Sequence, residues 1–141
     1  MKKAILILSL FFITTFMFSC TPDYRIVELN NDNYSNYYNF TTEFYPSEEK
    51  FIINAIRLHN DINVEFINNI ILVEKVYVYE IVNGNRILVY STDINQKGTL
   101  ELSNTFSINL PNLKDLINYS KESNYSINWT SKISGSIKIY K

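Results

Sequence analysis

The sequence predicts an all-β fold, a small antiparallel β-sandwich with one short helix, behind an N-terminal export signal. Runs of β-branched and aromatic residues recur at roughly 8–12-residue intervals, the spacing typical of sandwich strands. Asn83 and Gly84 lie between two such runs and are typical of a two-residue hairpin turn. Only the stretch around residues 113–117 has helical periodicity. A small barrel is the alternative architecture.

The first 19 residues have the layout of an export signal. Lys2 and Lys3 form a positive start, and residues 4–18 are apolar apart from a few hydroxyl side chains. A membrane-spanning helix needs about 20 apolar residues, and this run is shorter. Residues 1–19 are therefore predicted to be a signal peptide that is removed.

The four residues Met17, Phe18, Ser19 and Cys20 resemble the lipobox of bacterial lipoproteins. The resemblance covers only the first 20 residues. It implies cleavage between Ser19 and Cys20, a diacylglyceryl group on the Cys20 thiol and a further acyl chain, such as palmitate, on the new amine. Two or three acyl chains hold a protein stably on a membrane, whereas one chain binds only marginally. We therefore expect Cys20 to be a permanent lipid tether.

Composition excludes several classes of protein. The signal holds two of the 13 basic residues and none of the 14 acidic ones, so its removal leaves a formal charge of −3. Without a basic stripe to neutralise phosphates, no nucleic-acid partner is expected. Cys20 is the only cysteine, so the mature chain forms no internal disulfide. About 120 residues suffice for one domain and not for two.

The mature chain is divided into two parts. Residues 20–49 are expected to be the lipidated cysteine and a tether that leads into the domain, and residues 50–141 the β-sandwich. The tether is rich in Tyr and Phe, which disordered spacers lack. Part of it is therefore expected to pack on the domain, as a first strand near Arg25–Leu29 or Tyr37–Phe44. The asparagines near residues 30–33 are interpreted as solvated turn residues.

The middle of the chain predicts strands and turns. Phe51–His59 and Val64–Val73 are expected to be strands, and Glu74–Ser91 a hairpin around the Asn-Gly pair. On its first arm Val76 and Val78 would share one face, opposite Tyr77, Tyr79 and Ile81. Gln96, Lys97 and Gly98 are expected to form another turn.

The C-terminal third predicts four strands around the helix. Strands are expected over Thr99–Ser103 and Thr105–Leu110, and a helix follows near Leu113–Tyr119 with Asn112 as its N-cap. Two closing strands are expected, with a bend or bulge at Gly135. This order of elements is similar to that of small Ig-like sandwich lipoproteins, a resemblance of pattern that implies no functional residue.

No residue pattern indicates a catalytic, metal or cofactor site. His59 is the only histidine and is expected to be a surface residue, because a lone imidazole has no partner to complete a catalytic arrangement. Glu48 and Glu49 are adjacent and would point to opposite faces of a strand. The glycines are scattered rather than gathered in a phosphate-binding loop.

The expected function is that of a non-enzymatic cell-envelope lipoprotein. It would be attached to membrane lipid through Cys20, and its β-module would bind another envelope protein or act as an accessory or structural unit. Thr21 after Cys20 favours the outer membrane in a cell with two membranes. The alternative is a surface glycan-binding protein with Trp129 on its ligand surface, although strand alternation favours a core position for Trp129. A small envelope hydrolase is the weaker third hypothesis.

Overall fold

Two antiparallel sheets pack face to face in the computed structural model, which describes residues 22–100, 103–117 and 124–141. The four-stranded sheet has the order β1-β7-β4-β5, and the three-stranded sheet has the order β2-β3-β6. The predicted all-β sandwich with one short helix is confirmed. The elements are β1 (Tyr24–Leu29), η1 (Tyr34–Asn36), β2 (Tyr38–Tyr45), η2 (Pro46–Glu48), β3 (Lys50–Arg57), β4 (Val64–Val82), β5 (Asn85–Thr99), β6 (Asn104–Asn109), α2 (Leu113–Leu116) and β7 (Asn124–Tyr140).

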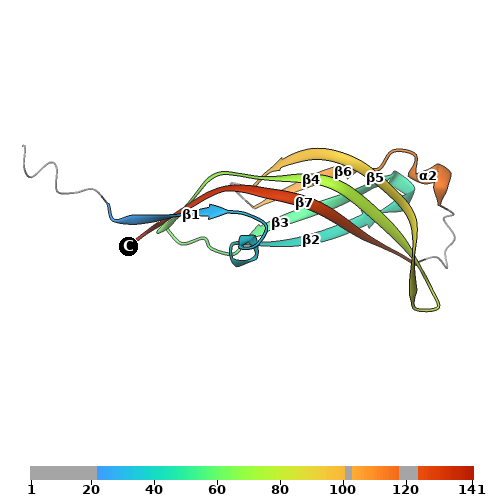
Figure 1. Cartoon of the computed structure of the whole chain (residues 1–141), viewed down its shortest axis with the longest axis horizontal. Helices are drawn as coiled ribbons and strands as arrows, with labels where there is room; N and C mark the ends of the chain where they lie inside the picture. Colours follow the sequence, from blue (N-terminus) through green and yellow to red (C-terminus); the bar gives the residue numbers. More distant parts are fainter. Residues whose placement is uncertain (1–21, 101–102, 118–123) are drawn as a thin grey trace, which may run out of the picture.

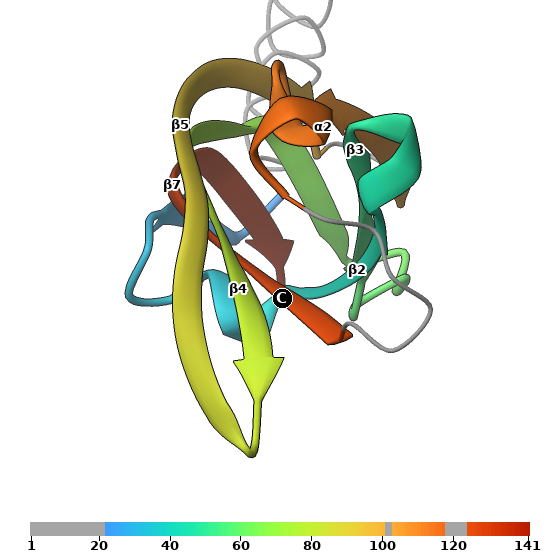
Figure 2. The ribbon, with the colours of Figure 1, turned by 90° about the vertical axis from the view of Figure 1, so that its right-hand side faces the viewer.

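The sandwich is elongated because β4 and β7 run along most of its length (Figure 1). β1 and the C-terminus lie at one end of the molecule, and α2 and the β4–β5 hairpin lie at the other. Seen from the hairpin end, the hairpin tip extends beyond both sheets (Figure 2). Its exposed side chains include four large aliphatic ones, Ile81, Val82, Ile87 and Leu88.

The segment before residue 50 contributes one strand to each sheet. β1 pairs with the end of β7, from Tyr24 opposite Tyr140 to Leu29 opposite Gly135. β2 pairs along its whole length with β3. The prediction that aromatic residues of this segment pack on the domain is confirmed, since Tyr38 is fully buried and Phe40 and Phe44 pack against the core. The sandwich therefore includes chain that the sequence assigned to the tether.

β4 is one continuous strand where the sequence predicts two, because two bulges restore its alternation. Val64 and Phe66 face the core at even positions, and Ile71 and Val73 face it at odd positions. The change of parity is absorbed where Asn68 and Asn69 lie opposite the single residue Gly135. A second register shift after Val73 returns the even positions to the core. Each bulge adds one residue, so apolar residues before, between and after the bulges all face the core. These residues are Val64, Phe66, Ile71, Val73, Val76 and Val78.

The Asn83-Gly84 hairpin is confirmed in detail. Val82 pairs with Asn85, and the two turn residues have φ of 51° and 79°, the left-handed values that a type I′ turn requires. Val76 and Val78 are fully buried, while Tyr77, Tyr79 and Ile81 on the other face are partly or largely exposed. The expected division of the two faces is thus correct.

The turn predicted at Gln96–Gly98 is wrong, because these residues lie inside β5. Lys97 pairs with Leu72, and Gly98 pairs with Ile71. A Cβ atom on Gly98 would lie 3.0 Å from the Phe106 ring of β6. Glycine in a strand commonly marks such a close approach between layers. Of the strand expected at Thr99–Ser103, residues 101–102 lie outside the described residues.

The helix forms where predicted but is shorter and is capped differently. α2 spans Leu113–Leu116, and residues 118–119 of the expected range are not described. Asn112 lies at the N-cap position, as predicted, but its φ is +63° and its side chain makes no capping hydrogen bond. Instead the Glu49 carboxylate accepts a hydrogen bond from the Lys114 N–H at 3.1 Å. The left-handed backbone of Asn112 differs from the extended backbone of a usual N-cap.

The C-terminal strands also differ from the prediction, because β7 is a single strand of 17 residues. Gly135 does mark a bulge, as expected, but the extra residue belongs to β4. Gly135 has a φ of +130°, and a Cβ atom there would lie 2.6 Å from Asn69 Cα and also against its side-chain oxygen. Only glycine fits this position.

Replacement of Gly135 by alanine is therefore expected to be the most damaging glycine substitution in the described sheets. Gly135→Ala should lower the free energy of unfolding, measured by urea titration, by at least about 3 kcal/mol, because backbone strain and a steric clash add. Gly84→Ala is the matched control, since open space surrounds Gly84 and only the left-handed φ is penalised. It should cost about 1–2 kcal/mol. Equal losses in the two variants would contradict the bulge argument.

Candidate functional site

The two sides of the sandwich are closed unequally. On the β5–β6 side the Gln96 amide donates to the Ser107 carbonyl at 3.0 Å, and the Phe106 ring lies against Gly98. On the other side β1 stops pairing at Gly135, so the first half of β7 has no strand on its outer edge within the described residues. β2 is the edge strand of the facing sheet there. We call this the open side.

A groove lies on the open side, between the edges of β2 and β7, with a volume of about 390 Å³. Its walls are aromatic and aliphatic, with hydroxyl and amide groups among them. Among these lining residues of the described chain there is no carboxylate, imidazole, amine or guanidinium. The chemistry of the wall suits an uncharged ligand. The lining residues are Tyr34, Ser35, Tyr38, Asn39, Phe40, Leu58, Trp129, Ser131 and Ile133.

Aromatic side chains in the wall of this groove pack against one another and against the core. The Phe40 ring lies 5.5 Å from the Tyr34 ring and 6.2 Å from the Tyr38 ring, centroid to centroid. Trp129 packs at 6.1 Å against Phe51 of the opposite sheet. Trp129 is half-buried, so one part of its ring belongs to the core and another part lines the groove. The core position expected for Trp129 is therefore confirmed in part, and its place on a ligand surface stays a prediction.

Buried hydrogen bonds join the floor of the groove to the β4 bulge. Asn69 is fully buried, and its Nδ2 donates to the Tyr38 hydroxyl at 3.3 Å. The Tyr38 hydroxyl donates in turn to the Leu100 carbonyl, and the Leu100 N–H donates to the Asn69 carbonyl at 2.6 Å. We call these three residues the polar triangle. It ties β2 of one sheet to β4 and the end of β5 in the other.

Asn31 takes the place of a strand where β1 ends. Its Nδ2 donates to the Ser131 carbonyl at 2.7 Å, and its Oδ1 accepts from the Ile133 N–H at 2.8 Å. The side-chain amide therefore bonds β7 as a peptide group would. Sequence reasoning treated Asn31 only as a solvated turn residue, and its pairing 100 residues away leaves no local signal.

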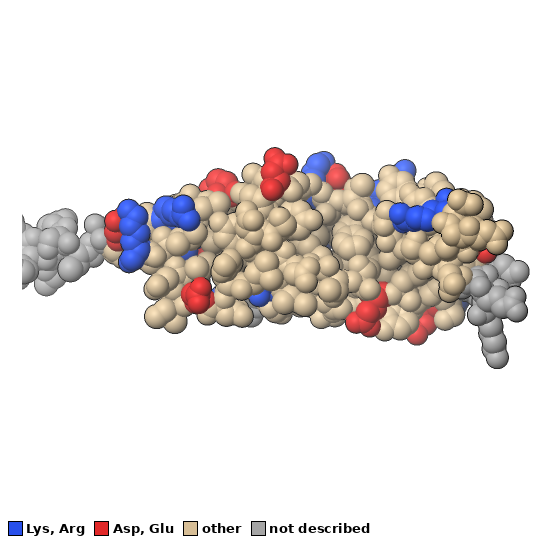
Figure 3. All heavy atoms as spheres, turned by 90° about the horizontal axis from the view of Figure 1, so that it is seen from below, with Lys and Arg blue, Asp and Glu red and all other residues tan. Residues whose placement is uncertain are grey.

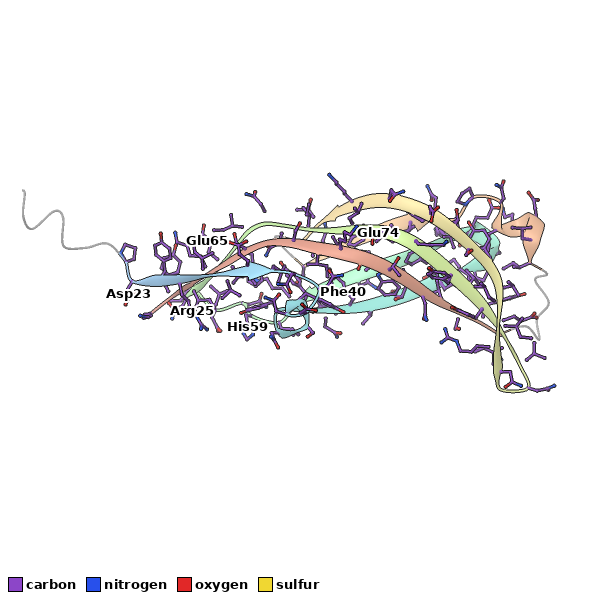
Figure 4. The ribbon with its side chains drawn as sticks, in the orientation of Figure 1. Asp23, Arg25, Phe40, His59, Glu65 and Glu74 are labelled. Atoms are coloured by element: carbon purple, nitrogen blue, oxygen red, sulfur yellow. The ribbon has the colours of Figure 1, made fainter. Side chains whose placement is uncertain are left out.

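His59 lies outside the groove. Its Nε2 is 3.0 Å from the Asn36 carbonyl, and its ring packs at 5.9 Å against Tyr37. It lines a second hollow of about 380 Å³ with Arg25, Val64 and others. Figure 4 shows His59 nearer than Phe40 to the end where Asp23 and Arg25 lie. The expectation of a surface histidine at a strand end is confirmed.

The groups with shifted pKa values have structural causes. A hydrogen bond of 2.6 Å from the Tyr45 hydroxyl lowers the pKa of Glu43, and burial raises the pKa of Tyr90, whose hydroxyl donates to the Pro111 carbonyl. Neither group lines the groove. On the face in Figure 3, Lys and Arg are interspersed with Asp and Glu and form no continuous basic track. No group of three metal-binding side chains occurs among the described residues.

The predicted site residues have different outcomes. Cys20 and Ser19 lie outside the described residues, so lipidation and cleavage stay predictions. Trp129 does line a groove. Sequence reasoning missed its companions Tyr34, Tyr38 and Phe40, although the density of aromatic residues in that segment was a signal that it packs against something.

Removal of the Tyr38 hydroxyl is expected to destabilise the fold without reshaping the groove. Tyr38→Phe deprives the buried Asn69 amide of its acceptor, which should lower the free energy of unfolding in urea by about 1–3 kcal/mol. Tyr34→Phe, on the rim of the same groove, is the control and should change it by less than about 0.5 kcal/mol. If the two variants prove equally stable, the polar triangle contributes nothing to the fold.

Comparisons with known proteins give no functional lead. No protein-family model matches the chain, and no curated protein is significantly similar to it. Within the described ranges, no helix has the length and apolar character needed to cross a membrane. The function must therefore be argued from the geometry of the open side.

Proposed function

We propose that this chain is a lipid-anchored cell-envelope protein whose sandwich is a non-enzymatic binding module, docking another envelope protein through its open side. One observation carries the proposal: an aromatic groove lined by no carboxylate, imidazole, amine or guanidinium lies beside a sheet edge that no strand of the described residues covers. Acid–base catalysis most often uses a histidine, a carboxylate or an amine, and the lining residues of this wall include none of these. Such a wall favours binding over turnover.

The anchoring part of the proposal rests on the lipobox-like residues and on where the fold begins. Only residues 21–23 separate Cys20 from β1, a reach of about 10 Å when extended. A lipidated Cys20 would hold the β1 end of the molecule at the membrane surface, with the hairpin tip pointing away (Figure 1). The proposed localisation is the cell envelope, in the outer membrane of a cell that has two.

In-cell cross-linking in the native host tests the proposal, with tagged protein then purified from the membrane fraction. The expected result is that one partner is recovered in near-equal amount with the wild type. Trp129→Ala, which removes the indole from the groove wall, should lose this partner. Ile87→Ser, which alters only the distant hairpin tip, should keep it. Cys20→Ala should remove the lipid mass, release the protein from membranes and reduce the yield of partner.

Three results would count against the proposal. Capture of no partner by a lipidated and folded wild type removes the docking function. Membrane attachment and an unshifted mass in Cys20→Ala remove the anchor. Loss of the partner in Ile87→Ser, with retention in Trp129→Ala, moves the docking surface to the hairpin tip.

A glycan ligand is the second candidate, and the position of Trp129 favours it. An indole beside Tyr34 with Ser35, Asn39 and Ser131 close by offers both a stacking surface and hydrogen-bonding groups for a neutral sugar.

Retention on a polysaccharide affinity gel tests the glycan candidate. If a glycan is the ligand, the wild type is retarded, Trp129→Ala runs unretarded with an unchanged circular dichroism spectrum, and Tyr77→Ala, on the outer face of β4, stays retarded. Equal mobility of all three proteins in every gel rejects the glycan candidate.

A further inference from the structure

The outer edge of β7 changes character halfway along the strand. Residues 135–140 pair with β1, and the Asn31 amide satisfies Ser131 and Ile133 just beyond it. From Asn124 to Thr130 the other edge of β7 is paired with β4, from Ile81 to Lys75. On the outer side of this stretch the described chain places no strand.

The main chain of this stretch points outward at alternate residues. The Ser131 carbonyl and the Ile133 N–H face the outer edge, since both bond Asn31 there. Main-chain groups in a strand alternate with period two, and β7 runs without an inserted residue from Asn124 to Ser131. The N–H and C=O groups of Trp129 and Ile127 therefore face outward as well, in line with the β1–β7 pairing.

The same stretch lacks the features that normally protect a sheet edge. Proteins blunt exposed edges with lysine, other charges or proline. The residues from Asn124 to Ser131 include none of these, and the first charge is Lys132. The edges of β1 and β5 carry charges, such as Arg25 and Glu28 on β1 and Asp93 and Lys97 on β5. The β6 edge also has no charge, but there the Gln96 side chain of β5 donates to the Ser107 carbonyl.

We propose that the outer edge of β7 from Ile127 to Trp129 is a strand-addition site for an extended, uncharged peptide segment of a partner protein. The inference rests on the proposed docking function and names the form of its partner. The incoming strand would lie along the same edge of β7 as β1, next to the end of β1. At the start of this stretch the Asn31 side-chain amide already bonds the β7 main chain, as a peptide group of an added strand would. Alternate side chains of the peptide would point between the sheets, into the β2–β7 groove.

The lining selects the side chains of the occupant. Apolar or aromatic side chains would contact Phe40, Leu58 and Trp129, whereas a charged side chain would meet no opposite charge among the groove's lining residues. Burial of an unpaired charge is costly. The partner segment is therefore neutral, extended and apolar at every second residue.

Amide hydrogen exchange measured by NMR on the full chain in detergent tests the edge directly. In the free protein the amides of Ile127 and Trp129 should exchange at least about tenfold faster than those of Ser126 and Asn128, which face β4. Slow exchange at all four positions means that the edge is covered in the protein itself, and the proposal fails without any ligand.

Peptide binding is then tested with a phage-displayed library of random heptapeptides selected on the same full chain. Enrichment of uncharged peptides with alternating apolar residues is expected, and a synthetic copy should slow exchange of the Ile127 and Trp129 amides by about tenfold or more. Ile127→Pro should abolish that binding and keep the fold, since this N–H bonds nothing in β4, whereas Asn128→Pro should unfold the sheet. Tyr77→Ala, on the outer face, is the neutral control.

The outcomes separate the inference from the proposed function. A library without enrichment, or an enriched peptide that protects no amide from Ile127 to Trp129, overturns the strand-addition site. Protection by a synthetic peptide of residues 124–131 instead assigns the edge to a second copy, and protection by a neutral hexasaccharide alone assigns the groove to glycans. If the edge is open and binds peptides but no partner is captured in cells, only the docking function is rejected. If a partner is captured but the edge is covered, only the strand-addition site is rejected.

Discussion

The bulge of β4 at Asn68 and Asn69 is the constraint on which the rest of the sandwich depends. Without one extra residue opposite Gly135, the apolar residues before and after it would point to opposite faces of the sheet. The bulge also turns the Asn69 side chain inward, where an unpaired amide would be costly. The Tyr38 hydroxyl accepts a hydrogen bond from Asn69 Nδ2, and so the bulge is linked to β2 of the other sheet. One local irregularity thereby fixes both the register of the large sheet and its alignment with the small one.

The open side of the sandwich begins next to the same bulge, at Gly135 of β7. β1 pairs with β7 only as far as Gly135, and the chain then turns away through Asn31 toward η1 and β2. The remaining half of β7 keeps an outer edge, and β2 stands across from it in the other sheet. The groove fills the space between these two edges, with Trp129 on one wall and Phe40 on the other. Beyond the β1 end, the next part of β7 thus has no neighbouring strand on its outer edge in the part of the chain that the structure describes.

The sequence was informative wherever the physics is local. The Asn83-Gly84 hairpin and the strands at β3 and β6 follow from turn chemistry and alternation within a few residues. The continuity of β4 could not be predicted, because a bulge interrupts the alternation of apolar and polar residues. In the sequence, such an interruption looks the same as the end of one strand and the start of another. The groove was hidden for a different reason: Tyr34, Phe40 and Trp129 come from segments about 90 residues apart, and Asn31 bonds a strand 100 residues away. Long-range pairing of β1 with β7 and packing of the two sheets against each other bring them together.

A short edge site suits a membrane-anchored protein on energetic grounds. An added strand that reaches Ile127 and Trp129 gains only a few main-chain hydrogen bonds, each worth a net of about 0.5–1.5 kcal/mol. One or two apolar side chains in the groove would add about 1.5–3 kcal/mol each. After the cost of association and of ordering the peptide, such a site is weak in free solution. If Cys20 and the partner share one membrane, the local concentration rises and a weak site is sufficient. The proposed anchor and the proposed edge site are therefore complementary: the lipid supplies proximity, and the uncharged edge beside the aromatic groove supplies selectivity.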